Sequence, residues 1–238
     1  LHTDNFEEVS FGPILYGAKK LGMHIHTRYE VSNNAGQDIC DIVNNEGFDF
    51  LLVGSGISMS DSPDDIAATR YRTSFYNRYF KRFKAPESWF YPGALLKDKT
   101  KMFIARSNCD VGVFINRNFV KATNTLVVIS SEEDLFLLDY TRTLLKATHG
   151  SVGIVAKMST TTPGHDQILK ELWDFVSSTP QTQLLPDKDL TPGLFNSYNF
   201  MLIGYNTWND VSEHRKEALQ KMPSTLILNK NKRSSSDN

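Results

Sequence analysis

Short apolar runs alternate with amphipathic segments through the second half of the chain. Runs rich in aliphatic and β-branched residues predict strands, and the segments between them have the spacing of helices. The predicted strands are 125–129, 151–156, 182–185, 200–203 and 225–228, and the predicted helices are 132–148, 165–178 and 209–222. This alternation predicts a parallel sheet with right-handed crossovers.

The first half shows the same kinds of element in a less regular order. Its predicted elements are a helix at Phe6–Leu21, a strand at His24–Val31, a helix at Gln37–Val43, a strand at Phe48–Val53, a short helix at Lys101–Cys109 and a strand at Val111–Ile115. An opening strand is lacking. We therefore expect that the sequence begins inside a domain or that further residues precede Leu1.

The two halves repeat one order of elements. In each, an apolar strand ends at a glycine (Gly54 or Gly204), and a helix and a closing strand follow. The repeat predicts an internal duplication: α/β units at residues 1–120 and 121–230, each with its own parallel sheet, joined near Phe119–Asn124. The tail, residues 231–238, has no apolar face, and we expect it to be disordered.

Residues 57–101 form an insertion in the first unit that begins acidic and becomes basic and aromatic. Interleaved cations and rings suit single-stranded nucleic acid or an anionic membrane surface. The helical spacing favours instead a helix with buried rings and exposed cations. The rings are Tyr71, Phe75 and Tyr79, and the cations are Arg72, Arg78 and Arg82. We expect this insertion to be the main contact surface for a partner.

Composition and charge limit the classes of protein to which the chain can belong. The chain has 238 residues, 40% of them hydrophobic, which suits one large or two small globular domains. A formal net charge of -1 gives no long-range field that would attract nucleic acid. Cys40 and Cys109 lie far apart, without the spacing of a zinc site or a disulfide framework. No apolar run approaches the ~20 residues of a membrane span, so we expect a soluble piece, one compatible with origin in a membrane protein.

Candidate sites are few. Open α/β sheets place ligands at the carboxyl ends of their strands, which makes Gly54, Ser55 and Gly56 a candidate nucleotide site, with a plain turn as the alternative. His24 and His26 share one face of the predicted strand but lack a third metal ligand, so we expect no metal.

The sequence gives even less support for a catalytic site than for a binding site. Asp187 and Asp189 form a loop pair more typical of a solvated turn than of acid/base catalysis. The sequence contains no nucleophile elbow, Walker loop or HExxH motif. We expect no enzymatic activity.

Three segments resemble a known family. They are C-D-V-G-V-F-I-N-R at Cys109–Arg117, T-L-V-V-I-S-S-E-E-D-L-F-L-L-D-Y-T at Thr125–Thr141, and F-M-L-I-G-Y-N-T-W-N-D-V at Phe200–Val211. They resemble the cytosolic C-terminal region of exchangers of the monovalent cation:proton antiporter-2 family, a tail that plant cation/proton exchangers and fungal potassium/proton antiporters carry.

The resemblance implies a fold and a function. The fold is a tandem universal-stress-protein-like (adenine nucleotide alpha hydrolase-like) arrangement of doubly wound parallel sheets. The function is that of a cytosolic regulatory domain in potassium(sodium)/proton exchange and pH homeostasis, at an endomembrane such as the Golgi. Implied partners are the membrane domain of the same antiporter, a second copy in a homodimer and a small-molecule effector, but no nucleic acid. The alternative is a freestanding universal-stress-protein-like nucleotide-binding protein.

The resemblance also bears on nucleotide binding. Universal stress proteins that bind ATP carry a G-x-x-G, nine residues, G-[S/T] pattern whose backbone amides hold phosphates. Here Gly56 is followed by no glycine until Gly93, and Gly204 by none at all. The acidic residue that usually meets the nucleotide after the first strand is replaced by Ser130 or Ser131. We therefore expect ATP binding to be weak or absent.

Overall fold

The computed structural model describes residues 6–28, 30–54, 98–158, 161, 163–186, 189–214 and 221–231. In the first half the elements are α1 (Phe6–Lys20), α2 (Ala35–Glu46), β1 (Phe50–Gly54), α4 (Asp98–Arg106) and β2 (Asp110–Ile115). In the second half they are β3 (Asn124–Ile129), the 3-10 helix η4 (Glu132–Asp134), α5 (Leu137–Thr148), β4 (Ser151–Ala156), α6 (His165–Ser178), β5 (Thr182–Pro186), α7 (Pro192–Phe195), β6 (Phe200–Gly204), α8 (Tyr205–His214) and β7 (Ser224–Asn229).

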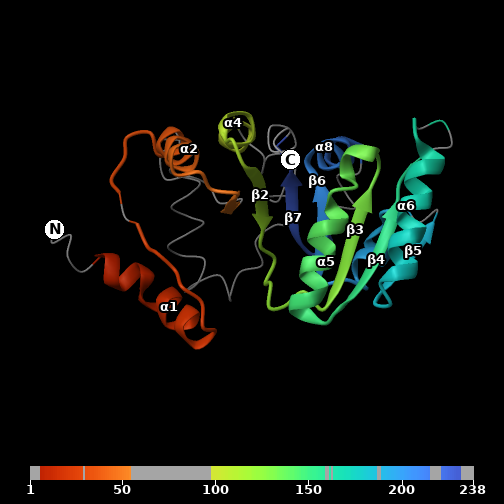
Figure 1. The fold of residues 1–238 in the computed structure, drawn as a ribbon, viewed down its shortest axis with the longest axis horizontal. Helices are drawn as coiled ribbons and strands as arrows, with labels where there is room; N and C mark the ends of the chain where they lie inside the picture. The colour runs from red at the N-terminus through yellow and green to blue at the C-terminus, as the bar shows by residue number, and fades with distance from the viewer. Residues whose placement is uncertain are drawn as a thin grey trace, which may run out of the picture.

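The strands form one seven-stranded sheet in the order β1-β2-β7-β6-β3-β4-β5 (Figure 1). Every neighbouring pair is parallel except β2 and β7, which are antiparallel. The predicted mixed α/β fold with a mostly parallel sheet is confirmed.

The expectation of a separate sheet in each half is wrong, because the sheet runs continuously from β1 to β5. The cause is the pairing of the last strand of each half. Residues Val111 to Ile115 of β2 pair in register with Asn229 to Thr225 of β7. Each strand thus covers an edge that the other would leave open. The division into two domains stays a prediction.

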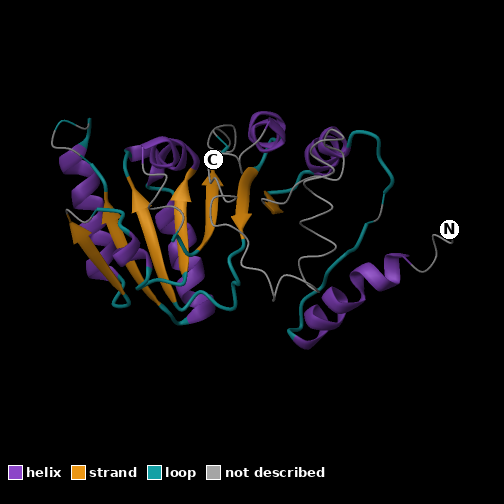
Figure 2. Ribbon diagram, turned by 180° about the vertical axis from the view of Figure 1, so that it is seen from behind, coloured by secondary structure: helices purple, strands orange, loops and turns teal. Residues whose placement is uncertain are grey.

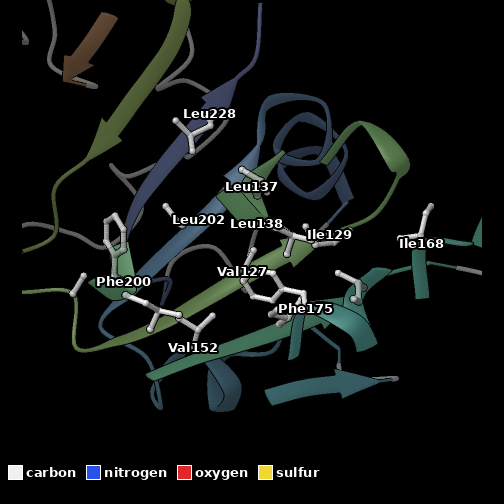
Figure 3. Packing of buried hydrophobic residues seen from close by; sticks show 14 residues of the cluster. Val127, Ile129, Leu137, Leu138, Val152, Ile168, Phe175, Phe200, Leu202 and Leu228 are labelled. Carbon is white, nitrogen blue, oxygen red and sulfur yellow. The ribbon is translucent and has the colours of Figure 1, made fainter. Parts of the chain in front are cut away.

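Two apolar layers cover the second half of the sheet, one on each face (Figure 2 shows the sheet from behind). Side chains alternate along β6: Phe200 and Leu202 pack with residues of α5 and α6, while Met201 and Ile203 pack with Trp208 of α8. Figure 3 shows the first layer, with Phe200, Leu202 and Leu228 on the strands beside side chains from the helices. Burial on both faces explains the continuous apolar runs of these strands.

Two predictions need correction, and one short helix was not predicted. Residues 24–28 and 30–31 lie outside any helix or strand, and His24 and His26 are exposed, because a strand needs a neighbour to accept its backbone hydrogen bonds. The link before β6 contains a short helix, α7, with Thr191 as its N-cap and Pro192 in its first turn. The helix α8 follows β6 directly and begins at Tyr205 rather than Asn209.

Several predictions fall outside the described residues. These are Ser55 and Gly56 of the candidate site, residues 57–97 of the insertion with its six named rings and arginines, Asp187 of the aspartate pair, and residues 232–238 of the tail. None of the described helices is both long and apolar enough to cross a bilayer.

Candidate functional site

The carboxyl ends of β3 and β6 meet where the strand order reverses. From β3 the chain builds outward through β4 and β5, and it then returns to add β6 on the other side of β3. Val128 lies opposite Ile203 near the ends of the two strands. In open α/β sheets such a switch point is where ligands bind, so we take it as the candidate site.

A carboxylate of the chain itself occupies this switch point. Asp134, at the end of η4, is only 2% exposed. Its Oδ2 accepts hydrogen bonds from the Thr207 hydroxyl at 2.6 Å, the Ser130 backbone N–H at 2.8 Å, and the backbone N–H of Ser131 and the hydroxyl of Ser130, both at 3.2 Å. The hydroxyls of Ser130 and Thr207 are also within hydrogen-bonding distance of each other, so the single proton of Ser130 has either Thr207 or Asp134 as its acceptor. The network joins the turn after β3 to α8.

Gly204, the last residue of β6, allows this arrangement. A Cβ at that position would collide with Oδ1 of Asp134. The strand can therefore approach the carboxylate closely only because residue 204 has no side chain. Gly204 thus leaves room for an aspartate at the end of the strand.

The buried carboxylate decides what the switch point can bind. Backbone N–H groups at the ends of β-strands are the donors that hold phosphates in nucleotide-binding sheets. Here the donors of Ser130 and Ser131 are bonded to Asp134. A phosphate would have to displace a hydrogen-bonded carboxylate of the same sign of charge. The geometry disfavours a phosphate ligand at this point.

An open cleft of about 730 Å³ lies next to Asp134, between α5, α6 and the ends of β6 and β7. Acidic side chains outnumber basic ones in its lining. The acidic residues are Glu132, Glu133, Asp134, Asp139, Glu171 and Asp174, and the basic residues are Arg142 and Lys230. An acidic lining repels phosphate groups. The cleft, like Asp134, therefore disfavours a phosphate ligand.

The predicted glycine site lies elsewhere on the sheet. Gly54 ends β1, is exposed, and lies opposite Phe114 of β2. Strands β2, β7 and β6 separate it from the switch point at β3. The site at Gly54, Ser55 and Gly56 stays a prediction, and Asp134 was not among the predicted site residues. The available signal was S-x-x-D at Ser131–Asp134, because a carboxylate three residues after an N-cap reaches back to the N-cap N–H.

Other reactive groups lie apart from this site. Cys40 and Cys109 are buried free thiols, and burial raises the pKa of both. They therefore remain protonated at neutral pH, the form that does not attack substrates. Among the residues that the structure describes, no group of three His, Cys, Asp or Glu could hold a metal ion.

A second polar network connects the two halves of the chain. The Tyr140 hydroxyl of α5 donates to Oδ2 of Asp110 at the start of β2, at 2.8 Å. Oδ1 of Asp110 accepts the backbone N–H of Asn231, and the Asn231 amide donates to the carbonyl of Ser107. Burial, reinforced by the hydrogen bond to Asp110, raises the pKa of Tyr140. The phenol thus stays protonated as a donor.

Comparison with known proteins supports the fold and no closer relationship. No protein-family model matches the chain, and no curated protein matches it. The structure is similar to that of a universal stress protein from Archaeoglobus fulgidus DSM 4304, with a TM-score of 0.51 and 12% identity over 96% of this chain and 79% of that one. A putative universal stress protein from Pseudomonas aeruginosa UCBPP-PA14 gives a TM-score of 0.47 and 11% identity, covering 94% and 79% of the two chains. The chain has a universal-stress-protein-like fold.

Proposed function

We propose that this chain is a regulatory and interaction module of a potassium(sodium)/proton antiporter. It would act at the cytosolic face of an endomembrane such as the Golgi and modulate monovalent cation and pH homeostasis. The observation that carries the proposal is the buried carboxylate of Asp134 at the switch point. A universal-stress-protein-like sheet whose phosphate position is filled from within is suited to contact another protein rather than to bind a nucleotide.

The positions of the family-like segments support this proposal. Cys109–Arg117 contains β2, Thr125–Thr141 contains all of β3 after its first residue and the turn of Asp134, and Phe200–Val211 contains β6 and most of α8. The residues that resemble an antiporter tail are therefore those that build the centre of the sheet and the closed switch point. The resemblance thus concerns the site as well as the fold.

Regulation of a transporter requires contacts that differ between its conformations. A module changes a transporter only if it binds one conformation of the membrane domain more tightly than another. We expect the insertion at residues 57–101 to make this contact through Arg72, Arg78 and Arg82. Replacing all three by glutamate should lower transport or partner binding while changing the free energy of unfolding by no more than ~0.5 kcal/mol per exposed site. A triple variant with wild-type transport would remove the contact role.

The alternative function is a freestanding nucleotide-binding protein. One observation favours it: the cleft of about 730 Å³ lies at the carboxyl ends of β6 and β7, where a doubly wound sheet holds ligands. Its acidic lining and the position of Asp134 argue against a phosphate-bearing ligand. An uncharged or cationic small effector fits the lining better.

Cell fractionation tests the proposed function. An antibody raised against this chain is used on membranes and cytosol of the source cells, followed by extraction with alkaline carbonate. An antiporter domain stays in the membrane pellet, in a protein long enough to contain about a dozen apolar spans of ~20 residues each. Recovery of a protein of this size in the cytosol would contradict the proposal and favour the freestanding alternative.

A further inference from the structure

Strand β1 is an edge of the sheet within the described residues, and its own sequence carries none of the usual protection. Among the described residues only β2 pairs with it. Its sequence, F-L-L-V-G, has no charge and no proline, and its Leu52 is 57% exposed. The opposite edge, β5, reads T-Q-L-L-P and ends in a proline. Proteins normally blunt an edge strand with polar residues or proline, because open edges accept further strands.

The sheet has a local two-fold relation that gives β1 a counterpart. In the first half β1 pairs with β2 from Phe50↔Asp110, and in the second half β6 pairs with β7 from Phe200↔Ser224. Both pairs join first residue to first residue. Between them, Val113 of β2 lies opposite Ile227 of β7. Each is the fourth residue of its strand, so the axis passes through this pair and relates β1 to β6.

The counterpart strand has a second neighbour, and no described strand takes the equivalent place beside β1. Strand β6, F-M-L-I-G, pairs on its outer side with β3, from Thr125↔Phe200 to Val128↔Ile203. With β3 in place every residue of β6 is buried, and Leu202 is only 2% exposed. The equivalent residue of β1 is Leu52, which is largely exposed. The difference in exposure follows from the missing neighbour, since the two strand sequences are alike.

We propose that the outer edge of β1 is a docking site for a β-strand from outside residues 1–238 that runs parallel to β1 and is apolar on both faces. The β6–β3 interface defines this occupant: β3 is parallel, and its Leu126–Ile129 are all buried. Main-chain hydrogen bonds would supply affinity, and alternate side chains would supply specificity. A second copy related by a two-fold axis would present β1 antiparallel and does not match this interface. The proposal does not depend on the antiporter assignment.

The test uses the 238-residue chain and a synthetic peptide with the sequence of residues 124–130, made soluble by two lysines at each end. Hydrogen exchange of individual backbone amides is followed with and without peptide at millimolar concentration. Analytical ultracentrifugation gives the oligomeric state. We expect a monomer whose outward-facing β1 amides exchange rapidly alone and at least tenfold more slowly with peptide. The β6 amides should be protected in both conditions.

Two substitutions localise the binding. Leu52→Lys places a charge on the edge that would be covered, and it should weaken peptide binding about tenfold or more, since burying a leucine side chain favours association by at least that factor. Val120→Lys is the matched control, because Val120 is 92% exposed and lies outside the strands. It should leave binding unchanged.

Four results would overturn the proposal. They are protected β1 amides in the monomeric chain alone, a dimer that protects β1, no protection of β1 by the peptide, and binding that Leu52→Lys leaves unchanged. The second result would assign the edge to another copy of the chain.

Discussion

Strands β1 and β6 are nearly identical in sequence but lie in different surroundings. Both are five residues long, begin with phenylalanine, end with glycine and lie beside the last strand of their half. Among the described residues only β6 has strands on both edges, and the carboxylate of Asp134 lies against its terminal glycine. Neighbours, rather than the strand's own sequence, decide which of the two is core.

The closed end of β6 should carry the largest single contribution to stability. Asp134→Ala removes charged hydrogen bonds and leaves the partly buried donors of Ser130 and Ser131 and the buried hydroxyl of Thr207 without this acceptor. We expect a loss of about 4 kcal/mol in the free energy of unfolding, measured by urea denaturation. The matched control is Asp139→Ala, because Asp139 is an exposed aspartate whose carboxylate pairs with the exposed Arg142. The control should stay within about 0.5 kcal/mol, and equal losses in both variants would refute the assigned role of Asp134.

The matched leucines test the comparison directly. Leu202→Ala should destabilise the chain by about 3 kcal/mol, because it leaves a cavity in the buried layer shown in Figure 3. Leu52→Ala should cost no more than about 0.5 kcal/mol, because the side chain is mostly exposed. Similar losses from the two variants, measured in urea, would mean that β1 is covered in solution.

The contact between the halves should have a smaller effect. Tyr140→Phe removes one hydrogen bond to Asp110 and should cost about 1 kcal/mol. Asp110 keeps the N–H of Asn231 as a partner, which limits the loss. Tyr16, which is 64% exposed, gives the matched control Tyr16→Phe, for which no change is expected.

This contact also predicts a pH dependence. The folded-state pKa of Tyr140 is raised above that of the unfolded chain, which is about 10. The contribution is therefore complete below pH 10 and is lost as the pH rises beyond it. Urea titrations from pH 8 to pH 11 should show a steeper loss of stability in the wild type than in Tyr140→Phe. Parallel curves would contradict a raised pKa of the half-buried Tyr140 phenol.

Much of the second half could be predicted because its elements are buried on regular faces. The bounds of β4 and α6 agree with the sequence prediction, since apolar periodicity reports burial directly. The prediction of a strand at His24–Val31 was wrong, because alternating polar and apolar residues show only that a segment is compatible with a strand. They cannot show whether a neighbouring strand exists to pair with it.

The site was harder to predict for the same reason. The S-x-x-D pattern at Ser131–Asp134 indicates a helix start, but the contacts with Gly204 and Thr207 come from residues about 70 positions away. Chain order also gave no sign that β2 and β7 would pair and make the sheet continuous. Such pairings depend on which edges remain open once each half has folded.

Calorimetry with ATP and AMP tests the central claim, that Asp134 closes the switch point at β3 and β6 against phosphates. The wild-type chain should give no heat of binding at micromolar ligand concentrations, because the backbone donors are already bonded to a carboxylate. Inorganic phosphate serves as the control for a simple anion. A micromolar dissociation constant for ATP, with affinity that grows with the number of phosphates, would contradict the account.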